Sequence, residues 1–153
     1  MKFIILLVLA SLTNVVCADV LPDKKLTPGA TNPQVTQENI ESTICVKGWT
    51  KTIRPPVSYT NGLKRQQIIA RGLPGTLKDY EEDHLIPLEL GGAPSDEKNL
   101  WPEPWDGDFG AHEKDVLENQ LHRMVCTHKM SLKDAQRAFA DNWIESYQRY
   151  TPK

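Results

Sequence analysis

The run of residues 82–101 constrains the fold more than any other part of the sequence. Its apolar segment, residues 85–88, is too short for a helix and contains a proline, so it predicts a strand or an extended arm. The pair Gly91-Gly92 then allows a sharp or left-handed turn of the backbone. Residues 99–101 predict a short return strand that ends at Pro102. The run as a whole therefore predicts a β-hairpin.

Polar residues stand at the ends of this predicted hairpin. Asp83 and His84 mark the start of its first strand, and Asn99 marks the start of its second. Residues 109–128 predict a helix, because apolar side chains recur on one side at helical spacing: Val116, Leu117, Leu121, Met124 and Val125. A hairpin followed by a helix would bring the three polar residues and the start of the helix close together.

This arrangement resembles the HNH nuclease motif, also called the ββα-metal finger. The matching residues are Asp83-His84, the turn at 90–92 and Asn99-Leu100, with His112 near the place of the motif's final histidine. The gap from Asn99 to His112 is longer than the motif usually has. The wider sequence also resembles small exported bacterial proteins with this motif. The resemblance implies an α+β fold, in which a small hairpin and a helix are embedded in a mainly helical single domain.

The resemblance also implies a catalytic role for His84. Hydrolysis of a phosphodiester needs a water made nucleophilic, a cation and stabilisation of the leaving oxygen. A histidine can act as the general base near neutral pH. Asn99, on the opposing strand, is expected to orient its ring by a side-chain or backbone hydrogen bond. The alternative is that Asp83-His84 is a buried pair that only holds the hairpin together.

A divalent metal ion is the cofactor that the resemblance implies. Asp83 supplies an oxygen ligand and His112 a nitrogen ligand in this interpretation, and Asp115 or Glu113 replaces His112 if the histidine is out of register. Imidazole suits zinc or manganese, whereas an all-oxygen site favours magnesium. The sequence leaves Mg, Mn and Zn open.

Charge is distributed unevenly along the chain. Residues 45–72 carry six basic side chains and no acidic one, whereas residues 73–120 are strongly acidic. The formal net charge of −2 argues against strong nucleic-acid binding, although the basic segment could hold phosphates while the acidic one holds a cation. Candidate phosphate ligands are Arg54, Arg71 and Lys114. The alternative is that both segments are ordinary solvated surface.

The first residues predict a signal peptide, residues 1–18. Lys2 is followed by an apolar stretch, residues 3–12, and by small residues around a cleavage site after Ala18. The stretch is too short to span a bilayer comfortably, and no other run approaches that length. Lipid attachment at Cys17 is the alternative. The mature protein is therefore expected to be secreted or periplasmic, with no membrane span after the signal is removed.

Removal of Cys17 leaves Cys45 and Cys126, an even pair in an oxidising compartment. They are predicted to form one disulfide that ties the segment before the motif to the helix after it. The alternative is that one of them is a nucleophile or a metal ligand.

The remaining chain predicts one domain preceded by a leader. Residues 19–35 are rich in Pro, Gly, Thr and Asn and have no apolar period, so they predict a flexible leader. Residues 36–150 predict the single HNH-like domain, and the chain is expected to be a monomer. Further helices are expected at 36–43, from Ser58 or Thr60 to about 71, and from 132 onward, where Leu132, Ala135, Phe139, Trp143 and Tyr147 form a stripe.

Three classes of function remain open from the sequence. The first is an exported metal-dependent nuclease or phosphodiesterase that hydrolyses DNA or RNA with His84 as general base. The second is a non-catalytic metal- or anion-binding module of the cell envelope that keeps the HNH-like finger. The third is a structural or interaction domain that holds no metal. Metal binding and cleavage of plasmid DNA discriminate among them, and a protein inhibitor is not identifiable from the sequence.

Overall fold

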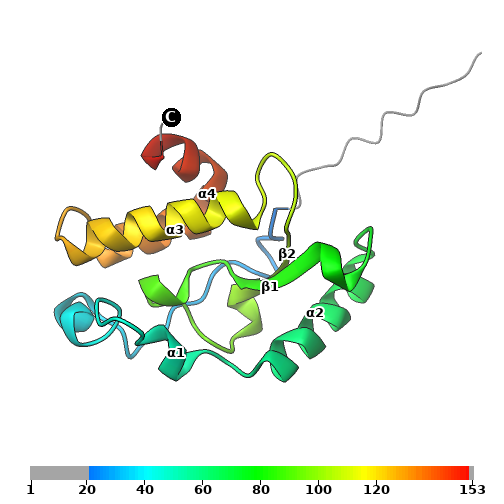
Figure 1. Ribbon diagram of the computed structural model, residues 1–153, viewed down its shortest axis with the longest axis horizontal. Coiled ribbons are helices and arrows are strands. Elements are labelled where there is room, and N and C mark those ends of the chain that lie inside the picture. Colours follow the sequence, from blue (N-terminus) through cyan, green and yellow to red (C-terminus); the bar gives the residue numbers. More distant parts are fainter. Residues whose placement is uncertain (1–20, 152–153) are drawn as a thin grey trace, which may run out of the picture.

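The computed structural model describes residues 21–151 (Figure 1). The predicted signal peptide and Cys17 lie outside the described residues. The described chain contains α-helices, one antiparallel hairpin and short 3₁₀ turns, which confirms the α+β prediction. In order, the elements are η1 (Gln37–Ser42), α1 (Thr50–Ile53), α2 (Val57–Arg71), η2 (Leu77–Asp79), β1 (Tyr80–His84), η3 (Leu88–Leu90), η4 (Glu97–Asn99), β2 (Leu100–Pro104), α3 (Ala111–Cys126) and α4 (Leu132–Tyr150).

The hairpin pairs β1 with β2, from Tyr80 opposite Pro104 to His84 opposite Leu100. The first strand therefore ends at His84. Of the two alternatives for residues 85–88, the strand is wrong, and the run forms no strand pairs up to Leu88, where η3 begins. Pro87 cannot donate to a strand ladder, and the Asn99 side chain bonds the backbone N–H of Ile86 in place of a partner strand. The apolar segment instead forms the buried start of a long connection between the strands.

Helices lie on both sides of the hairpin, with α2 on one side and α3 on the other (Figure 1). Gln67 on α2 donates hydrogen bonds to Glu82 Oε1 and to the carbonyl of Leu100, each at 3.1 Å. The helix α2 begins at Val57, directly after two prolines. Its start therefore precedes the predicted start at Ser58 or Thr60. It ends at Gly72 as expected, because that residue has a φ of +60° and its N–H bonds the carbonyl of Ile68.

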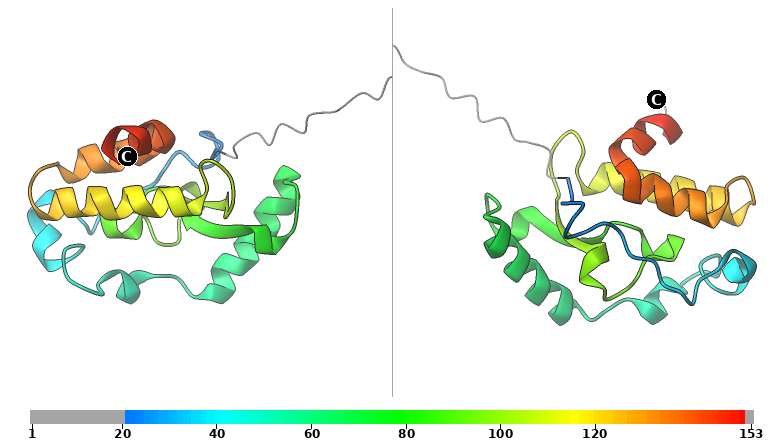
Figure 2. Two further views of the ribbon diagram at one scale, coloured as in Figure 1. Left: turned by 45° about the horizontal axis from the view of Figure 1, so that its top comes forward. Right: turned by 180° about the vertical axis from the view of Figure 1, so that it is seen from behind.

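The predicted stripes of α3 and α4 form half of the main core cluster, although Val116 of the α3 stripe is exposed. Leu117, Leu121 and Val125 on α3 are buried in one cluster with apolar side chains of α4. Ser131 caps α4 by accepting a hydrogen bond from the N–H of Asp134 at 3.1 Å. The backbone of α4 departs from helical geometry at Asn142, where the last turns change direction (Figure 2).

A disulfide joins Cys45 to Cys126 at the end of α3, as predicted. Both sulfur atoms are therefore engaged, and the alternative of a nucleophilic or metal-binding cysteine is wrong. His122 lies beside the bond and its Nε2 contacts the carbonyl of Ile44 at 2.9 Å. The bond closes a loop of the kind that stabilises a fold by a few kcal/mol in the chain-entropy model, since about 80 residues lie between its ends.

Most of the predicted flexible leader packs on the domain. Thr27 is fully buried, the N–H of Gly29 bonds the carbonyl of Lys98 at 2.9 Å, and the N–H of Asn32 bonds the carbonyl of Gly91 at 2.8 Å. This segment runs along the rear of the molecule (Figure 2, right, blue). The ordered domain therefore begins before residue 36. None of the helices in the described part of the chain is long and apolar enough to cross a membrane.

Candidate active site on the hairpin

His84, the last residue of β1, has a buried side chain with one ring nitrogen fixed. Nε2 lies 2.9 Å from the carbonyl oxygen of Pro94. A carbonyl only accepts, so Nε2 carries the hydrogen and, in the neutral ring, Nδ1 carries the lone pair. Burial lowers the pKa of His84, and the charge of Asp83 opposes this effect without reversing it. The ring is therefore neutral near pH 7 and can accept a proton at Nδ1.

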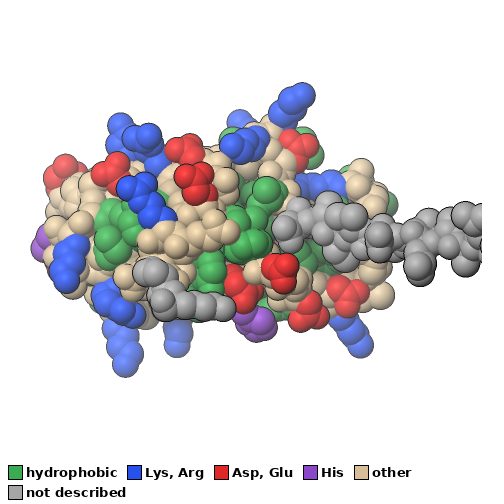
Figure 3. Space-filling model, turned by 90° about the horizontal axis from the view of Figure 1, so that it is seen from above, with side chains coloured by type: hydrophobic (Ala, Val, Ile, Leu, Met, Phe, Trp, Pro, Cys, Tyr) green, Lys and Arg blue, Asp and Glu red, His purple; other side chains and the backbone are tan. Residues whose placement is uncertain are grey.

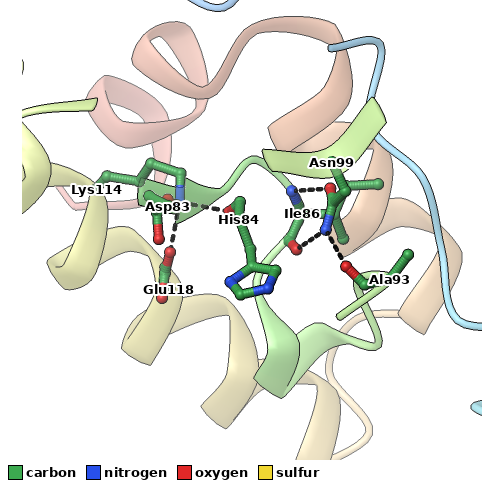
Figure 4. A network of polar contacts seen from close by, with 7 residues as sticks. All are labelled: Asp83, His84, Ile86, Ala93, Asn99, Lys114 and Glu118. Carbon is green, nitrogen blue, oxygen red and sulfur yellow. Dashed lines mark hydrogen bonds and ion pairs between the residues drawn. The ribbon is translucent and has the colours of Figure 1, made fainter. Parts of the chain in front are cut away.

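Asn99 is fully buried and holds the connection that precedes Pro94. Its Oδ1 accepts from the N–H of Ile86 at 2.9 Å, and its Nδ2 donates to the carbonyls of Ile86 and Ala93 at 3.0 and 3.1 Å (Figure 4). The predicted hydrogen bond from Asn99 to the His84 ring is therefore replaced by bonds to the backbone. Asn99 positions the carbonyl that accepts from the ring and does not touch the ring itself.

Lys114 reaches from α3 to the strand end that carries His84. Its buried ammonium group donates to Asp83 Oδ2, to Glu118 Oε1 and, at 3.0 Å, to the carbonyl of His84 (Figure 4). Burial alone would lower the pKa of Lys114, but the charges of Asp83 and Glu118 raise it well above its usual value. An ammonium has three hydrogens, so all its donors are used. The prediction of Lys114 as a phosphate ligand is wrong because the group is 1% exposed and fully engaged.

Three carboxylates converge on the same face of the hairpin. Glu81 faces Glu103 across the two strands, and Asp83 follows two residues further along β1. One carboxylate oxygen of each lies within 4.8 Å of one from each of the others, which makes the group able to hold a metal ion. Glu103 is 1% exposed, and its Oε1 has no hydrogen-bond partner among the described residues.

The pKa values in this group are shifted by burial and by the charges of neighbouring side chains. Burial, with the charges of Asp83 and Asp115, raises the pKa of Glu81 to about 7. Burial raises the pKa of Glu103 well above its usual value. The pKa of Asp83 is lowered, because Lys114 and His84 outweigh the effect of burial. A proton on Glu103, shared with Asp83, or a bound cation would relieve the repulsion between these carboxylates.

His112 and Asp115, the other predicted metal ligands, lie on exposed positions of α3. The His112 ring packs against Trp105, with 5.9 Å between ring centroids. Asp115 is near enough to Asp83 for that charge, after burial, to raise its pKa. Neither residue belongs to the three-carboxylate group. The predicted ligand set is therefore not assembled. The rotation of α3 about its axis points Lys114 toward Asp83, whereas His112, two residues earlier, faces another direction.

The two predicted arginines lie in different places. Arg54 is exposed, and its charge acts on the pKa values of His84, Glu81 and Asp115, so it lies on the side of the site. Arg71 instead donates to Thr27 Oγ1 at 3.3 Å, and its charge acts on Glu82. Successive strand residues face opposite sides, so Arg71 is separated from Asp83 by the hairpin.

A pocket beside Glu81, which Glu82 also lines, contains basic residues that the sequence analysis did not single out. Its basic lining is Lys64, Arg65 and Lys78, and Trp105 forms part of its wall. Lys64 is partly committed, since its ammonium donates to the carbonyls of Leu77 and Tyr80 at 2.9 and 2.7 Å. Arg65 and Lys78 are exposed.

Glu81 and Glu103 were also missed. Alternation along β1 places Glu81 on the face of Asp83, which was a usable signal, but Pro102 concealed the continuation of β2 to Glu103. Comparisons of the chain with protein-family models, with curated proteins and with solved structures gave no match. The resemblance to the HNH motif therefore depends on the motif residues, and the geometry of the site is an independent observation.

Proposed function

We propose that this protein is an exported, divalent-metal-dependent phosphodiester hydrolase that cleaves nucleic acid. The observation that carries the proposal is the environment of His84: a buried, neutral imidazole, fixed through Nε2, at the end of a strand that also bears a cluster of carboxylates. A group of this kind is suited to take a proton from water near neutral pH.

The proposed roles follow from the bonds of the ring. Nδ1 of His84 accepts the proton from the attacking water, and Nε2 keeps its hydrogen bond to the carbonyl of Pro94. Asp83, adjacent in sequence, favours the imidazolium that results. Asn99 fixes the connection that ends at Pro94, so it acts on the reaction through the position of the ring.

The residues fit a divalent cation. Carboxylate oxygens are the ligands that Mg²⁺ and Mn²⁺ take in proteins, and Glu103 Oε1 is a buried acceptor without a donor. Asp83 Oδ2 accepts from Lys114, and the Asp83 carboxylate still offers an oxygen to the three-carboxylate group. When bound, the cation would supply positive charge to stabilise the charge that develops on the phosphate.

Nucleic acid is the substrate class best supported by the charges around the site. Arg54 lies on the side of His84, and the pocket beside Glu81 offers Arg65, Lys78 and the ring of Trp105. Basic groups next to an aromatic ring are typical of contacts to phosphates and bases. On the face seen in Figure 3, several acidic side chains gather beside a histidine, and the basic side chains lie mostly toward the edges of the view.

Export and a monomeric state complete the proposal. The N-terminal pattern of charge, apolar run and small residues supports export, and a disulfide supports an oxidising compartment.

Nicking of supercoiled plasmid DNA by the purified mature protein tests the proposal. We expect nicking with Mg²⁺ or Mn²⁺ and none with EDTA. His84→Gln keeps a donor for the carbonyl of Pro94 but has no base, so the rate should fall by about 10²-fold or more. His112→Gln is the matched control and should retain most activity. Wild-type protein that is folded but inactive on DNA and RNA with every divalent metal would count against the proposal.

A second candidate is a non-catalytic metal-binding module with the same finger. It is favoured by one observation: the Lys114 ammonium binds the Asp83 carboxylate that the resemblance assigns to the metal. Metal binding without cleavage of any nucleic acid would select this candidate.

A further inference from the structure

We infer that the metal of this protein is bound by Glu81, Asp83 and Glu103, an all-carboxylate site on the hairpin that excludes His112. The inference deepens the proposed function, on which it rests for the role of the metal. The ligand set itself is measurable without catalysis. The resemblance assigned only Asp83 of these three residues, so the site differs from the expected one in two of its ligands.

The strand register builds the site. Glu81 and Glu103 are directly opposed, and Asp83 projects from the same face because strand side chains alternate. Like charges directly opposed on a hairpin are destabilising, so this arrangement needs a compensating charge. The three ligand oxygens lie within 4.8 Å of one another, which is close enough for one ion to contact all three.

Glu103 gives an independent indication of a ligand. Its side chain is 1% exposed, and Oε1 has no hydrogen-bond partner among the described residues. Buried polar atoms are nearly always paired, because an unpaired one costs about 1–3 kcal/mol. The Glu103 side chain also hydrogen-bonds Asp83, and Oε1, without a donor beside two further carboxylates, is the atom that a cation would contact.

Lys114 supplies only part of the compensating charge, although its charge acts on both Glu81 and Glu103. It donates to Asp83 Oδ2 and to Glu118 on α3, and its third hydrogen is used by the carbonyl of His84. It therefore anchors one oxygen of Asp83 and leaves Glu81 and Glu103 without a hydrogen bond to a basic side chain.

Binding of Mn²⁺ to EDTA-treated mature protein, followed by electron paramagnetic resonance and calorimetry, tests the inference, with Mg²⁺ as competitor. Glu103→Gln and Glu81→Gln keep side-chain size and should each weaken binding by at least about tenfold. Glu82→Gln is the matched control: it makes the same substitution at the neighbouring position on the opposite face and should leave the affinity within twofold. His112→Ala should also leave it unchanged.

Each possible result either supports or overturns the proposed ligand set. No saturable Mn²⁺ binding, or binding weakened by His112→Ala and not by Glu103→Gln, overturns the inference. Thermal melts without metal show whether each variant is folded. If Mn²⁺ binds as expected but no nucleic acid is cleaved, the ligand set stands and the proposed function fails. If nucleic acid is cleaved and Glu103→Gln binds Mn²⁺ normally, the proposed function stands and the ligand set fails.

Discussion

Lys114 on α3 donates a hydrogen bond to the backbone carbonyl of His84, with 3.0 Å between Nζ and the oxygen. A helix residue thus fixes the strand end that carries the proposed base. Because the same ammonium pairs with Asp83 and Glu118, one buried cation couples the packing of α3 to the geometry of the hairpin. A change at this lysine should therefore affect both stability and the site.

Replacement of Lys114 by methionine should destabilise the protein strongly. The change leaves Asp83 and Glu118 without their partner, and breaking a buried pair in this way costs about 3–5 kcal/mol. Urea denaturation measures the loss. Lys133→Met, at an exposed position of α4, is the matched control and should change stability by less than about 0.5 kcal/mol. A loss below about 1 kcal/mol at Lys114 would show that the pair is not needed.

Replacement of each of two glycines by alanine should change the stability of the protein in opposite directions. A Cβ at Gly92 would lie 1.8 Å from the carbonyl oxygen of Ile86 and 2.8 Å from Asn99 Nδ2, so Gly92→Ala must displace the connection before the site. Gly62 lies in α2 with nothing within 4 Å of a Cβ, and Gly62→Ala should stabilise by about 0.5–1 kcal/mol. Thermal melts of both variants measure the effects. Equal melting temperatures would contradict the packing described for Gly92.

The features that the sequence predicted correctly each leave a local pattern. The stripes of α3 and α4 repeat at helical spacing, the Ser131 cap precedes its helix, and the two glycines mark the connection between the strands. The disulfide followed from counting: once the signal peptide is set aside, Cys45 and Cys126 are the only cysteines.

The features that the sequence analysis missed depend on the register of the strand pairing or on the rotation of a helix about its axis. The pairing of Glu81 with Glu103 needs β2 to continue through Pro102, which the sequence suggested would end it. The direction in which Lys114 points depends on the rotation of α3 about its axis, which is set by the connection between β2 and α3. The packing of residues 27–35 uses backbone hydrogen bonds, which leave no pattern in the side chains.

The raised pKa of Glu82 should make the stability of the protein depend on pH. Burial raises the pKa of this carboxyl to about 8 in the folded protein, against about 4.3 in the unfolded chain. Between these values the folded state binds more protons at Glu82 than the unfolded state. Its contribution to stability is therefore present below about pH 4.3 and is lost as pH rises toward 8.

Glu82→Gln removes this dependence and keeps an acceptor for Gln67. The variant should be more stable than wild type at pH 8, and the difference should shrink toward pH 5. Urea denaturation at several pH values gives the two curves. Glu145→Gln, at an exposed position of α4, is the control and should run parallel to wild type. A constant difference between Glu82→Gln and wild type across this range would contradict the assigned pKa.

The pocket beside Glu81 should bind phosphates of a nucleic acid through Arg65 and Lys78. Both side chains are exposed and line the pocket with Trp105, so the double variant Arg65→Ala/Lys78→Ala should bind a single-stranded oligonucleotide less tightly without unfolding. Each lost phosphate contact should reduce the slope of log affinity against log salt by about one. Fluorescence anisotropy in EDTA measures this in the absence of cleavage. Lys129→Ala/Lys133→Ala removes the same charge near the turn between α3 and α4, at the far end of the molecule from α2 in Figure 1, and is the matched control. If the two double variants lose affinity equally, binding follows net charge and the pocket is not the binding site.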